Sequence, residues 1–357
     1  MSKKDQKLKI LVGLSGGVDS AVVAYLLKKE GHQVAAVFMK NFSSRDNVNK
    51  ECPWKKDQAE AQKVADFLDI NLETWDFEEQ YRETVVKYLF DTYKKGLTPN
   101  PDILCNSEIK FKLFLCKALL AGYDKIATGH YAQIKEDKDG YHLLQGLDDN
   151  KDQTYFLAGL NQEQLAHSLF PIGKIKKPEV RQIAKKAGLP NAERKDSQGI
   201  CFVGKVKLKD FLQQQIPAKT GNIIDINGKI IGQHEGVVYY TIGQRKGIDI
   251  GGGPALYVIS KKLDTNELIV GPKESIELYT KKIKVTDWHW LAKEHEFPIK
   301  AHGKIRYRQE DQALEVNKLD NGLYEATFKE KQFASAAGQT LAIYLKDELI
   351  ASAIIID

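Results

Sequence analysis

The sequence has few cysteines, few methionines and no long apolar segment. Its 357 residues include four cysteines, two methionines and ten prolines. No segment approaches the roughly 18 consecutive apolar residues of a membrane span, and the charged first residues do not lead into a signal-peptide core. These absences exclude a membrane-spanning protein, a disulfide scaffold and a proline-rich disordered chain. We therefore expect a globular cytoplasmic protein without a membrane partner.

The four cysteines do not have the spacing of a metal site. None of them forms a C-x-x-C pair, so the sequence favours neither zinc nor another metal held by a protein cluster. An iron–sulfur cluster held by the cysteines and Asp102 remains an alternative that the spacing does not demand. Cys116 lies in an apolar helical pattern, which predicts a packing role, and Cys52 receives no chemical role.

The composition indicates a folded protein of two or three domains. The chain is 42% hydrophobic and 28% charged, which suits a buried core. Its net charge of +5 permits a nucleic-acid partner but does not establish one, because a slightly basic enzyme has the same balance.

The first half of the chain alternates strand and helix patterns. Strand patterns occupy residues 9–14, 33–39, 71–75 and 125–128, and helical patterns occupy 18–30, 55–68, 78–95 and 109–121. This order predicts an α/β fold of Rossmann-like type, in which helices cover both faces of a parallel sheet.

Short alternating runs replace the helical patterns after about residue 208. Turns rich in Gly, Asn and Asp separate the runs, which predicts short antiparallel strands in one or two small barrels or sandwiches. We therefore expect three domains: a catalytic domain over 1–207, a small β-rich domain over 208–280 and a barrel-like domain over 281–357.

A glycine-rich loop, Ser15-Gly16-Gly17-Val18-Asp19-Ser20, joins the first strand to the first helix. Consecutive glycines allow several backbone N–H groups to point into one concavity, and the helix adds its positive N-terminal end. Asp19 cannot favourably face a phosphate alone, so we expect a bridging Mg²⁺. The loop lacks the lysine of the common triphosphate-hydrolase loop, which favours a grip on pyrophosphate with chemistry at the α-phosphate.

This loop resembles the PP-loop of the ATP pyrophosphatase superfamily, whose members adenylate a carbonyl or carboxyl oxygen and release pyrophosphate. The resemblance implies ATP as cofactor, with Mg²⁺. It also implies ATP contacts at a set of positions around the loop, namely Gly13, Leu14, Ser15, Gly16, Gly17, Val18, Asp19, Ser20, Met39 and Gly129.

Two cysteines lie in segments that suit a reactive thiol. Cys105 follows a rigid stretch with Pro99 and Pro101, at or just before a helix start, where a thiol pKa is depressed. Asp102 could serve there as acid or base, although a proline-containing connection with a buried cysteine is the plainer alternative. Cys201 follows a polar, glycine-containing loop, and a thiol pair could transfer sulfur by persulfide chemistry if the fold brings the two together.

Two basic regions could contact RNA. The cluster Lys304, Arg306, Tyr307 and Arg308 interleaves an aromatic ring with cations, which suits stacking on an extruded base. The other region precedes Cys201 and could track a phosphate backbone or be a solvated face. It consists of Lys174, Lys176, Lys177, Arg181, Lys185, Lys186, Arg194 and Lys195.

Taken with the loop, these motifs closely resemble the bacterial tRNA-specific 2-thiouridylase family. The matching segments are Asn100-Pro101-Asp102 with Cys105, Gly129-His130-Tyr131, Lys151-Asp152-Gln153 and Asp196 to Cys201. The resemblance implies adenylation of the 2-oxygen of the wobble uridine in tRNA for Lys, Glu and Gln. Sulfur then replaces the oxygen, supplied as a persulfide by a cysteine desulfurase or a sulfur-relay protein.

The resemblance also implies a role for each matching residue. Cys201 corresponds to the persulfide-bearing cysteine, Cys105 to the partner that releases sulfur or the product and then forms a disulfide with Cys201, and Asp102 to the acid or base. Asn100, Pro101 and Asp102 correspond to contacts with the target base. The implied tRNA contacts are His130, Lys151, Asp152, Gln153, Tyr307, Arg308 and Gln339.

Two rival functions remain open on the sequence. A PP-loop ligase that adenylates a small metabolite would explain the loop but leave both cysteine motifs unused. A non-catalytic RNA-binding protein with a vestigial nucleotide site would explain the basic regions but not the thiols.

Overall fold

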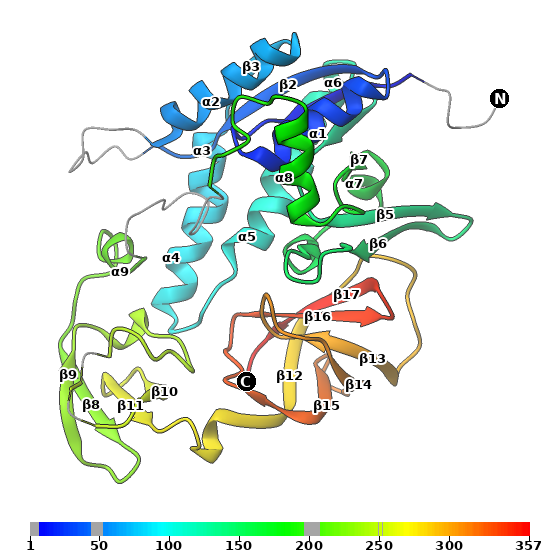
Figure 1. The fold of residues 1–357 in the computed structure, drawn as a ribbon. Helices are drawn as coiled ribbons and strands as arrows, with labels where there is room; N and C mark the ends of the chain where they lie inside the picture. The colour runs from blue at the N-terminus through cyan, green and yellow to red at the C-terminus, as the bar shows by residue number, and fades with distance from the viewer. Residues whose placement is uncertain (1–6, 44–52, 196–207, 249, 252) are drawn as a thin grey trace.

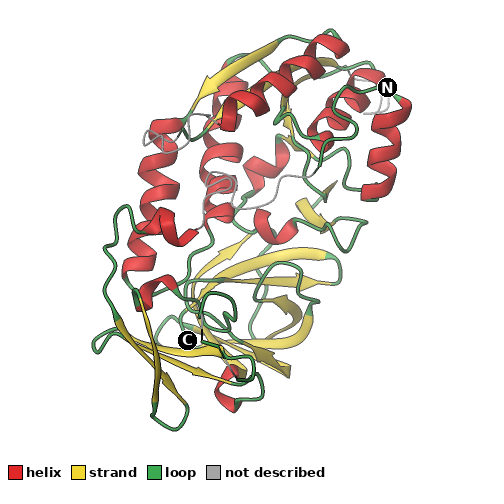
Figure 2. Ribbon diagram, turned by 60° about the vertical axis from the view of Figure 1, so that its left-hand side comes forward, coloured by secondary structure: helices red, strands yellow, loops and turns green. Residues whose placement is uncertain are grey.

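The computed structural model describes residues 7–43, 53–195, 208–248, 250–251 and 253–357. Cys52 and the whole Asp196 to Cys201 motif lie outside these ranges. The described chain forms three sheets, of five, four and eight strands, with helices gathered around the first of them (Figures 1 and 2). No helix within the described ranges is long and apolar enough to cross a membrane.

The first sheet is entirely parallel, with the strand order β3-β2-β1-β4-β7. Alternate residues of β1 enter different cores, because Leu11 packs on one face of the sheet and Ile10 and Val12 on the other. The expected α/β fold is therefore confirmed. The strands are β1 (Lys9–Gly13), β2 (Gln33–Lys40), β3 (Leu72–Asp76), β4 (Lys125–Ala127) and β7 (Ser168–Leu169).

Helices cover both faces of this sheet (Figure 2). One core contains side chains of α1 (Val18–Lys29), α2 (Pro53–Leu68) and α8 (Lys177–Lys186). The other core contains side chains of two helices that each include a π-helical segment. They are α3 (Glu78–Tyr81), η2 (Arg82–Val86) and α4 (Lys87–Lys94), then α5 (Pro101–Leu104), η3 (Cys105–Phe114) and α6 (Leu115–Leu120).

The second of these helices begins at Pro101, earlier than the predicted residue 109. Proline suits the first helical position because its missing N–H would have no partner there, and Asn100 caps the helix by accepting from Ile103 N at 3.4 Å. The packing role expected for Cys116 is wrong, since this thiol is exposed. Leu115 and Ala118 are the α6 residues that turn to the core.

The second sheet is small and mixed, with the order β10-β11-β8-β9. Its central pair, β11 and β8, is parallel, which corrects the expectation of antiparallel strands throughout this region. The other two pairs are antiparallel. The elements are α9 (Leu208–Leu212), β8 (Gly221–Asp225), β9 (Ile230–His234), η5 (Val237–Tyr239), β10 (Tyr257–Lys262), β11 (Glu267–Gly271) and η6 (Ile276–Leu278).

Six strands of the third sheet close into a barrel, because β12 pairs with both β15 and β17. This confirms the barrel expected at the C-terminus, and its interior is filled by its own apolar core. The strands are β12 (Tyr279–Trp290), β13 (Ile299–Lys304), β14 (Gln312–Lys318), β15 (Tyr324–Phe333), β16 (Thr340–Leu345) and β17 (Glu348–Ile355).

A hairpin from the first half of the chain extends the barrel sheet, which the sequence did not predict. β6 pairs with the start of β17, where Leu143 lies opposite Leu349, and β5 follows at the edge. The same hydrophobic core that lines the parallel sheet continues to Tyr344 of the barrel and Tyr239 of the middle region. The hairpin and its neighbours are β5 (Ala132–Asp137), β6 (Gly140–Gln145), η4 (Thr154–Leu157) and α7 (Gln162–Ala166).

Candidate active site

The phosphate loop is shaped by its own hydroxyl groups. Ser20 Oγ accepts from Ser15 N at 3.2 Å and donates to Gly17 O at 3.1 Å, and the two serine hydroxyls lie 3.2 Å apart. The chain then enters α1, whose first-turn N–H groups have no partner within the helix. The loop therefore presents backbone donors and a helix N-terminus to one place, as an anion site requires.

Gly16 is a position that only glycine fits. Its φ is +78°, and a Cβ there would lie 2.4 Å from the Asp57 carbonyl oxygen. The Gly16 carbonyl accepts from Asn191 Nδ2 at 2.8 Å and from Arg194 Nη1 at 2.9 Å. Two side chains from beyond α8 thus brace the turn from outside.

The ends of three neighbouring strands meet at the loop. Gly129, two residues after β4, packs so closely on α1 that a Cβ there would lie 3.0 Å from Ser20 N. Met39 lies at the end of β2, with its Cε methyl 3.2 Å from where a Gly13 Cβ would be. Ligands of parallel α/β sheets bind beyond the carboxyl ends of the strands, and all the predicted ATP contacts gather at that edge.

Asp19 is held by two partners from distant segments. Its carboxylate accepts from Lys177 Nζ at 2.7 and 2.8 Å and from the Tyr131 hydroxyl at 2.8 Å. Within the described ranges, no group of three or more His, Cys, Asp or Glu side chains could hold a metal ion. A single carboxylate still suits Mg²⁺, which takes one or two carboxylates together with substrate phosphates. Asp19 therefore fits the expected ion, and release of Lys177 would leave more of its oxygen lone pairs open to it.

A charged network fixes the end of β2 beside Met39. Lys40 Nζ lies 2.7 Å from Asp76 and 3.1 Å from Glu78, which also contacts Arg82 at 2.8 Å. Burial alone would raise the pKa of Glu78, but hydrogen bonds from Ser43, Arg82 and Lys40 lower it to about 2. The network borders a hollow of about 590 Å³ at this edge of the sheet.

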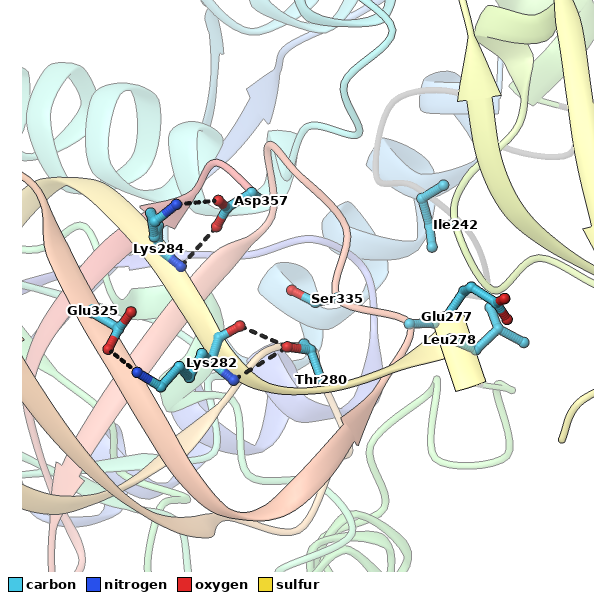
Figure 3. Close-up of a pocket in the computed structure, with 10 residues that line it drawn as sticks. Ile242, Glu277, Leu278, Thr280, Lys282, Lys284, Glu325, Ser335 and Asp357 are labelled. Carbon is cyan, nitrogen blue, oxygen red and sulfur yellow. Dashed lines mark hydrogen bonds and ion pairs between the residues drawn. The ribbon is translucent and has the colours of Figure 1, made fainter. Parts of the chain in front are cut away.

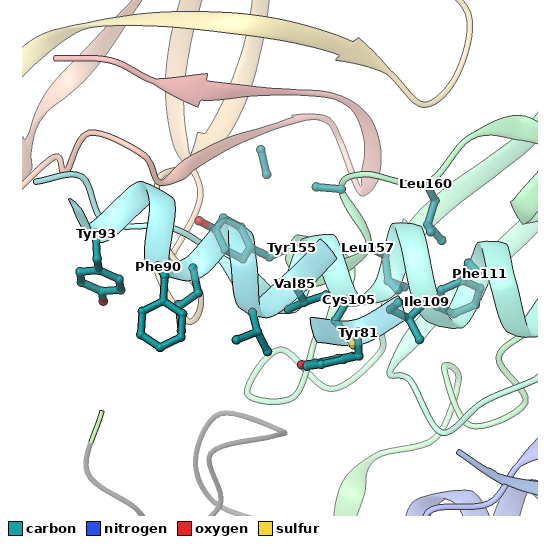
Figure 4. Close-up of a cluster of buried hydrophobic side chains, with 14 of the residues drawn as sticks. Tyr81, Val85, Phe90, Tyr93, Cys105, Ile109, Phe111, Tyr155, Leu157 and Leu160 are labelled. Carbon is teal, nitrogen blue, oxygen red and sulfur yellow. The ribbon is translucent and has the colours of Figure 1, made fainter. Parts of the chain in front are cut away.

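Cys105 lies in the second turn of the helix that begins at Pro101, and it is buried, with 2% of its surface exposed. Its neighbours in the apolar cluster include Tyr81, Val85 and Ile109 (Figure 4). Asp102 precedes it by three residues and is half-buried. The segment predicted to carry sulfur chemistry therefore lies against an apolar core.

The barrel holds the start of this helix in place. Gln339 Nε2 donates to the carbonyls of Thr98 and Pro99 at 2.9 and 3.0 Å. Tyr155 is hydrogen-bonded to the Asn100 side chain and donates to Thr340 O at 2.9 Å. Residues of β16 and of the turn before it thus fix the backbone that leads into the helix.

A second contact joins the barrel to the same helix through aromatic rings. Asn106 Nδ2 donates to Phe156 O at 2.8 Å, and the Phe156 ring lies 4.4 Å from the Tyr307 ring, centroid to centroid. The Arg308 guanidinium lies 5.4 Å from the centre of the Tyr307 ring. Arg308 is exposed and Tyr307 half-buried, so this pair faces outward beside the helix.

His130 lies between the phosphate loop and the Cys105 helix. It is buried, its Nδ1 lies 2.7 Å from the Thr128 hydroxyl, and its ring packs on Phe111 and Phe170. Burial, together with the charge of Lys110, holds the pKa of His130 well below its usual range. The imidazole is therefore neutral near neutral pH, and its contact to a nucleic acid would not be a cationic one.

The segment 151–153 is tied to the protein interior. Asp152 is buried and accepts from Gly146 N at 3.0 Å and from the Thr154 hydroxyl at 2.9 Å. Gln153 accepts from Tyr131 N at 3.0 Å. The Gln153 bond holds the backbone of Tyr131, whose hydroxyl donates to Asp19.

The basic region before residue 196 is not one solvated face. Lys177 pairs with Asp19, Arg181 donates to the Arg194 carbonyl, and Arg194 itself braces Gly16. The exposed members are Lys174, Lys176, Lys185, Lys186 and Lys195. A further hollow of about 440 Å³ lies on the barrel near Lys282, Lys284 and Asp357 and contains none of the predicted site residues (Figure 3).

Comparison with known proteins covers almost the whole chain. Family models described as a tRNA methyl transferase HUP domain, a tRNA methyl transferase PRC-barrel domain and an aminomethyltransferase beta-barrel domain match residues 8–205, 209–272 and 280–355. A protein of Idiomarina loihiensis named tRNA-specific 2-thiouridylase MnmA is 46% identical, over 97% of this chain and 95% of its own. A protein of the same name from Methylobacillus flagellatus is 44% identical, over 98% and 99%. The chain belongs to the tRNA-specific 2-thiouridylase family.

The structure brings together most of the positions that the resemblance to the thiouridylase family implied as site residues. The ATP positions converge on one sheet edge, and His130 links that edge to the Cys105 helix. From the barrel region, Gln339 contacts the residues just before this helix, and Tyr307 packs on Phe156, whose carbonyl accepts from Asn106 of the helix. Their roles stay predictions, and Cys201 lies outside the described residues. The sequence did not predict the role of Phe156 or the contact between Lys177 and Asp19. The absence of a lysine within residues 15–20 was a signal that a lysine from elsewhere in the chain could lie beside the loop.

Proposed function

We propose that this protein is a tRNA-uridine 2-sulfurtransferase that uses ATP. The proposal rests on one observation: the adjacent residues Gly129 and His130 connect the anion-binding loop to the helix that carries the buried Cys105. Gly129 packs against Ser20 of the loop, and the His130 ring packs on Phe111 of the helix. In the proposed reaction the 2-oxygen of a wobble uridine attacks the α-phosphate of ATP. Pyrophosphate leaves from residues 15–20, and AMP is then displaced by sulfur.

The sulfur half of the reaction uses the two cysteines of the sequence motifs. The outer sulfur of a persulfide on Cys201 attacks C2 of the adenylated base and displaces AMP, which leaves C2 and Cys201 joined through a disulfide bond. The Cys105 thiolate then attacks Cys201 Sγ, so that this S–S bond breaks, 2-thiouridine is released and a Cys105–Cys201 disulfide remains. Reduction of the disulfide precedes the next turnover. Asp102 acts as the acid or base of the sulfur transfer. Mg²⁺ on Asp19 would offset the negative charge of the ATP phosphates. The persulfide comes from a desulfurase or a relay protein.

The proposed substrates are the tRNAs for Lys, Glu and Gln. The proposed place of the reaction is the cytoplasm. Asn100, Pro101 and Asp102 would contact the extruded base, while Tyr307 and Arg308 offer a ring and a cation for stacking. Contacts at His130, Gln339 and 151–153 would complete the RNA surface. His130 and Asp152 are buried, so they would act by positioning the neighbouring backbone.

Mass spectrometry of tRNA nucleosides tests this function directly. Purified protein is incubated with ATP, Mg²⁺, tRNA and a persulfide donor, and 2-thiouridine at the wobble position is the expected product. Omitting ATP and replacing Cys201 by serine are the controls that should remove it. Pyrophosphate release that depends on a small acid and ignores tRNA would instead indicate a ligase.

A further inference from the structure

Lys177 occupies a position that is costly for a lysine. Its side chain is 9% exposed although it is the first residue of α8, where the helix dipole disfavours a cation. Lysine is seldom buried, and a buried ion pair recovers little more than its desolvation penalty. Stability alone therefore does not explain why this ammonium is placed beside the phosphate loop.

The fold directs the Lys177 ammonium toward the phosphate loop, where it contacts the Asp19 carboxylate. The Lys177 backbone N–H donates to Asp148 Oδ2 at 2.8 Å, which fixes the start of α8. From there the side chain reaches Asp19, and its Nζ lies 5.9 Å from the centre of the Tyr131 ring. Asp19 is one residue before Ser20, whose hydroxyl shapes the loop.

The loop needs a cation for the chemistry proposed above. Phosphate loops of nucleotide hydrolases carry a lysine that reaches the phosphates, and this loop has none in its own six residues. Lysine suits the task because its compact charge sits on a flexible stem that can move between two nearby acceptors. Asp19 is one such acceptor, and a phosphate held by the loop would be the other.

We propose that Lys177 is the phosphate-binding lysine of this loop, supplied from 158 residues away along the chain. Without nucleotide, Asp19 and Tyr131 hold the ammonium beside the loop. When ATP binds, Lys177 moves onto the phosphates and Asp19 becomes available to Mg²⁺. The exchange would keep each charge paired, because a phosphate oxygen would accept from the ammonium while the carboxylate would be available to hold the metal. This inference rests on the proposed use of ATP.

Calorimetric titration of the full chain with ATP and with adenosine tests the proposal. Lys177→Met keeps the apolar stem and removes the charge, so ATP with Mg²⁺ should bind about 10- to 100-fold more weakly, as expected for one lost charge-assisted bond. Adenosine, which has no phosphate, should bind as it does to the unmodified protein. Lys174→Met, an exposed lysine three residues earlier, is the matched control and should change neither affinity.

A second pair of variants separates phosphate binding from simple neutralisation of Asp19. If Lys177 only neutralises that carboxylate, Lys177→Met combined with Asp19→Asn should bind ATP as well as Asp19→Asn alone. The proposal expects the double variant to stay about 10-fold or more weaker. The double variant buries no unpaired charge, so it also serves if Lys177→Met alone fails to fold.

Either of two results would overturn the proposal. One is an unchanged ATP affinity in Lys177→Met, and the other is a double variant that binds ATP as tightly as Asp19→Asn alone. Neither measurement involves tRNA or sulfur. A protein that binds ATP through Lys177 but never thiolates tRNA would refute the proposed function and leave this inference standing.

Discussion

The phosphate loop takes its shape from neighbours in sequence, whereas the helix start before Cys105 takes its position from the far end of the chain. Within the loop, Ser15, Gly17 and Ser20 bond to one another. At the helix start, the Thr98 and Pro99 carbonyls are held by Gln339, more than 200 residues away. One end of the candidate site is thus a local motif, and the other depends on docking of the barrel.

The difference separates two kinds of failure. Damage to the loop should remove nucleotide binding and leave the barrel contacts intact. Damage at the barrel contact should leave nucleotide binding intact and misplace the thiol. Variants at the two ends can therefore be compared in one protein with two measurements, ATP affinity and tRNA thiolation.

The largest expected effect is at the thiol itself. Cys105→Ser should reduce tRNA thiolation by about 100-fold or more, because a hydroxyl is a far weaker nucleophile than a thiolate, while ATP affinity is unchanged. Cys116→Ser is the matched control, since that thiol is exposed on the same helix. Normal thiolation by Cys105→Ser would reduce this residue to a packing role.

Next comes the glycine that the loop requires. Gly16→Ala should lower the free energy of unfolding by about 2 kcal/mol or more, because alanine is strained at positive φ and its methyl group meets the Asp57 carbonyl. Chemical denaturation measures this loss, and ATP affinity should fall with it.

Gly17→Ala is the control for that loss. Its φ is −77°, and the added methyl meets only Ser15 Oγ, at 3.4 Å. The expected change in unfolding free energy is below about 0.5 kcal/mol. If Gly17→Ala destabilised the protein as much as Gly16→Ala, positive φ and the close approach of the Asp57 carbonyl would not explain the need for glycine at position 16.

A smaller effect is expected at the barrel contact. Gln339→Leu removes both hydrogen bonds to the Thr98 and Pro99 carbonyls and should slow thiolation about 10-fold, the equivalent of one or two lost hydrogen bonds. Single-turnover rates and the KM for tRNA separate the causes. A slower rate at unchanged KM indicates positioning of the helix, and a raised KM alone indicates an RNA contact. Gln312→Leu in β14 controls for loss of a barrel glutamine.

The smallest effect concerns the hairpin that joins the two halves. His142 of β6 lies 2.7 Å from Glu348 of β17 and 2.8 Å from Asp137. Burial alone would lower the pKa of His142, but the hydrogen bonds to Glu348 and Asp137 outweigh it and raise the pKa above 6.5. The bonds therefore stabilise the fold fully below pH 6.5, and this contribution is lost as the pH rises through the raised value.

Thermal unfolding from pH 5.5 to 8.5 measures that contribution. The stability difference between the unmodified protein and His142→Asn should be at most about 1 kcal/mol at the acid end and should shrink toward the alkaline end. A difference that is constant across the range would exclude the proposed ion pair.

Most of the first half was predictable because its signals are local. The apolar alternation of β1 and the glycines of the loop depend on residues next to one another, and strand, turn and helix followed as expected. The predicted helix over 109–121 begins too late because the prolines disfavour helix only for the residues before them, and Pro101 itself is favourable at the first helical position. The exposure of Cys116 was missed because an apolar pattern does not say which side of a helix meets the core.

The sequence by itself determined the parallel-sheet fold, the barrel, the anion-binding loop and the family, since each rests on short patterns of residue type. Only the tertiary structure decided that β6 joins β17, that Gln339 holds the turn before Cys105, and that Lys177 reaches Asp19. The reason is physical: those contacts join residues separated by more than 150 positions, and no local propensity records which distant side chain will fill a given place.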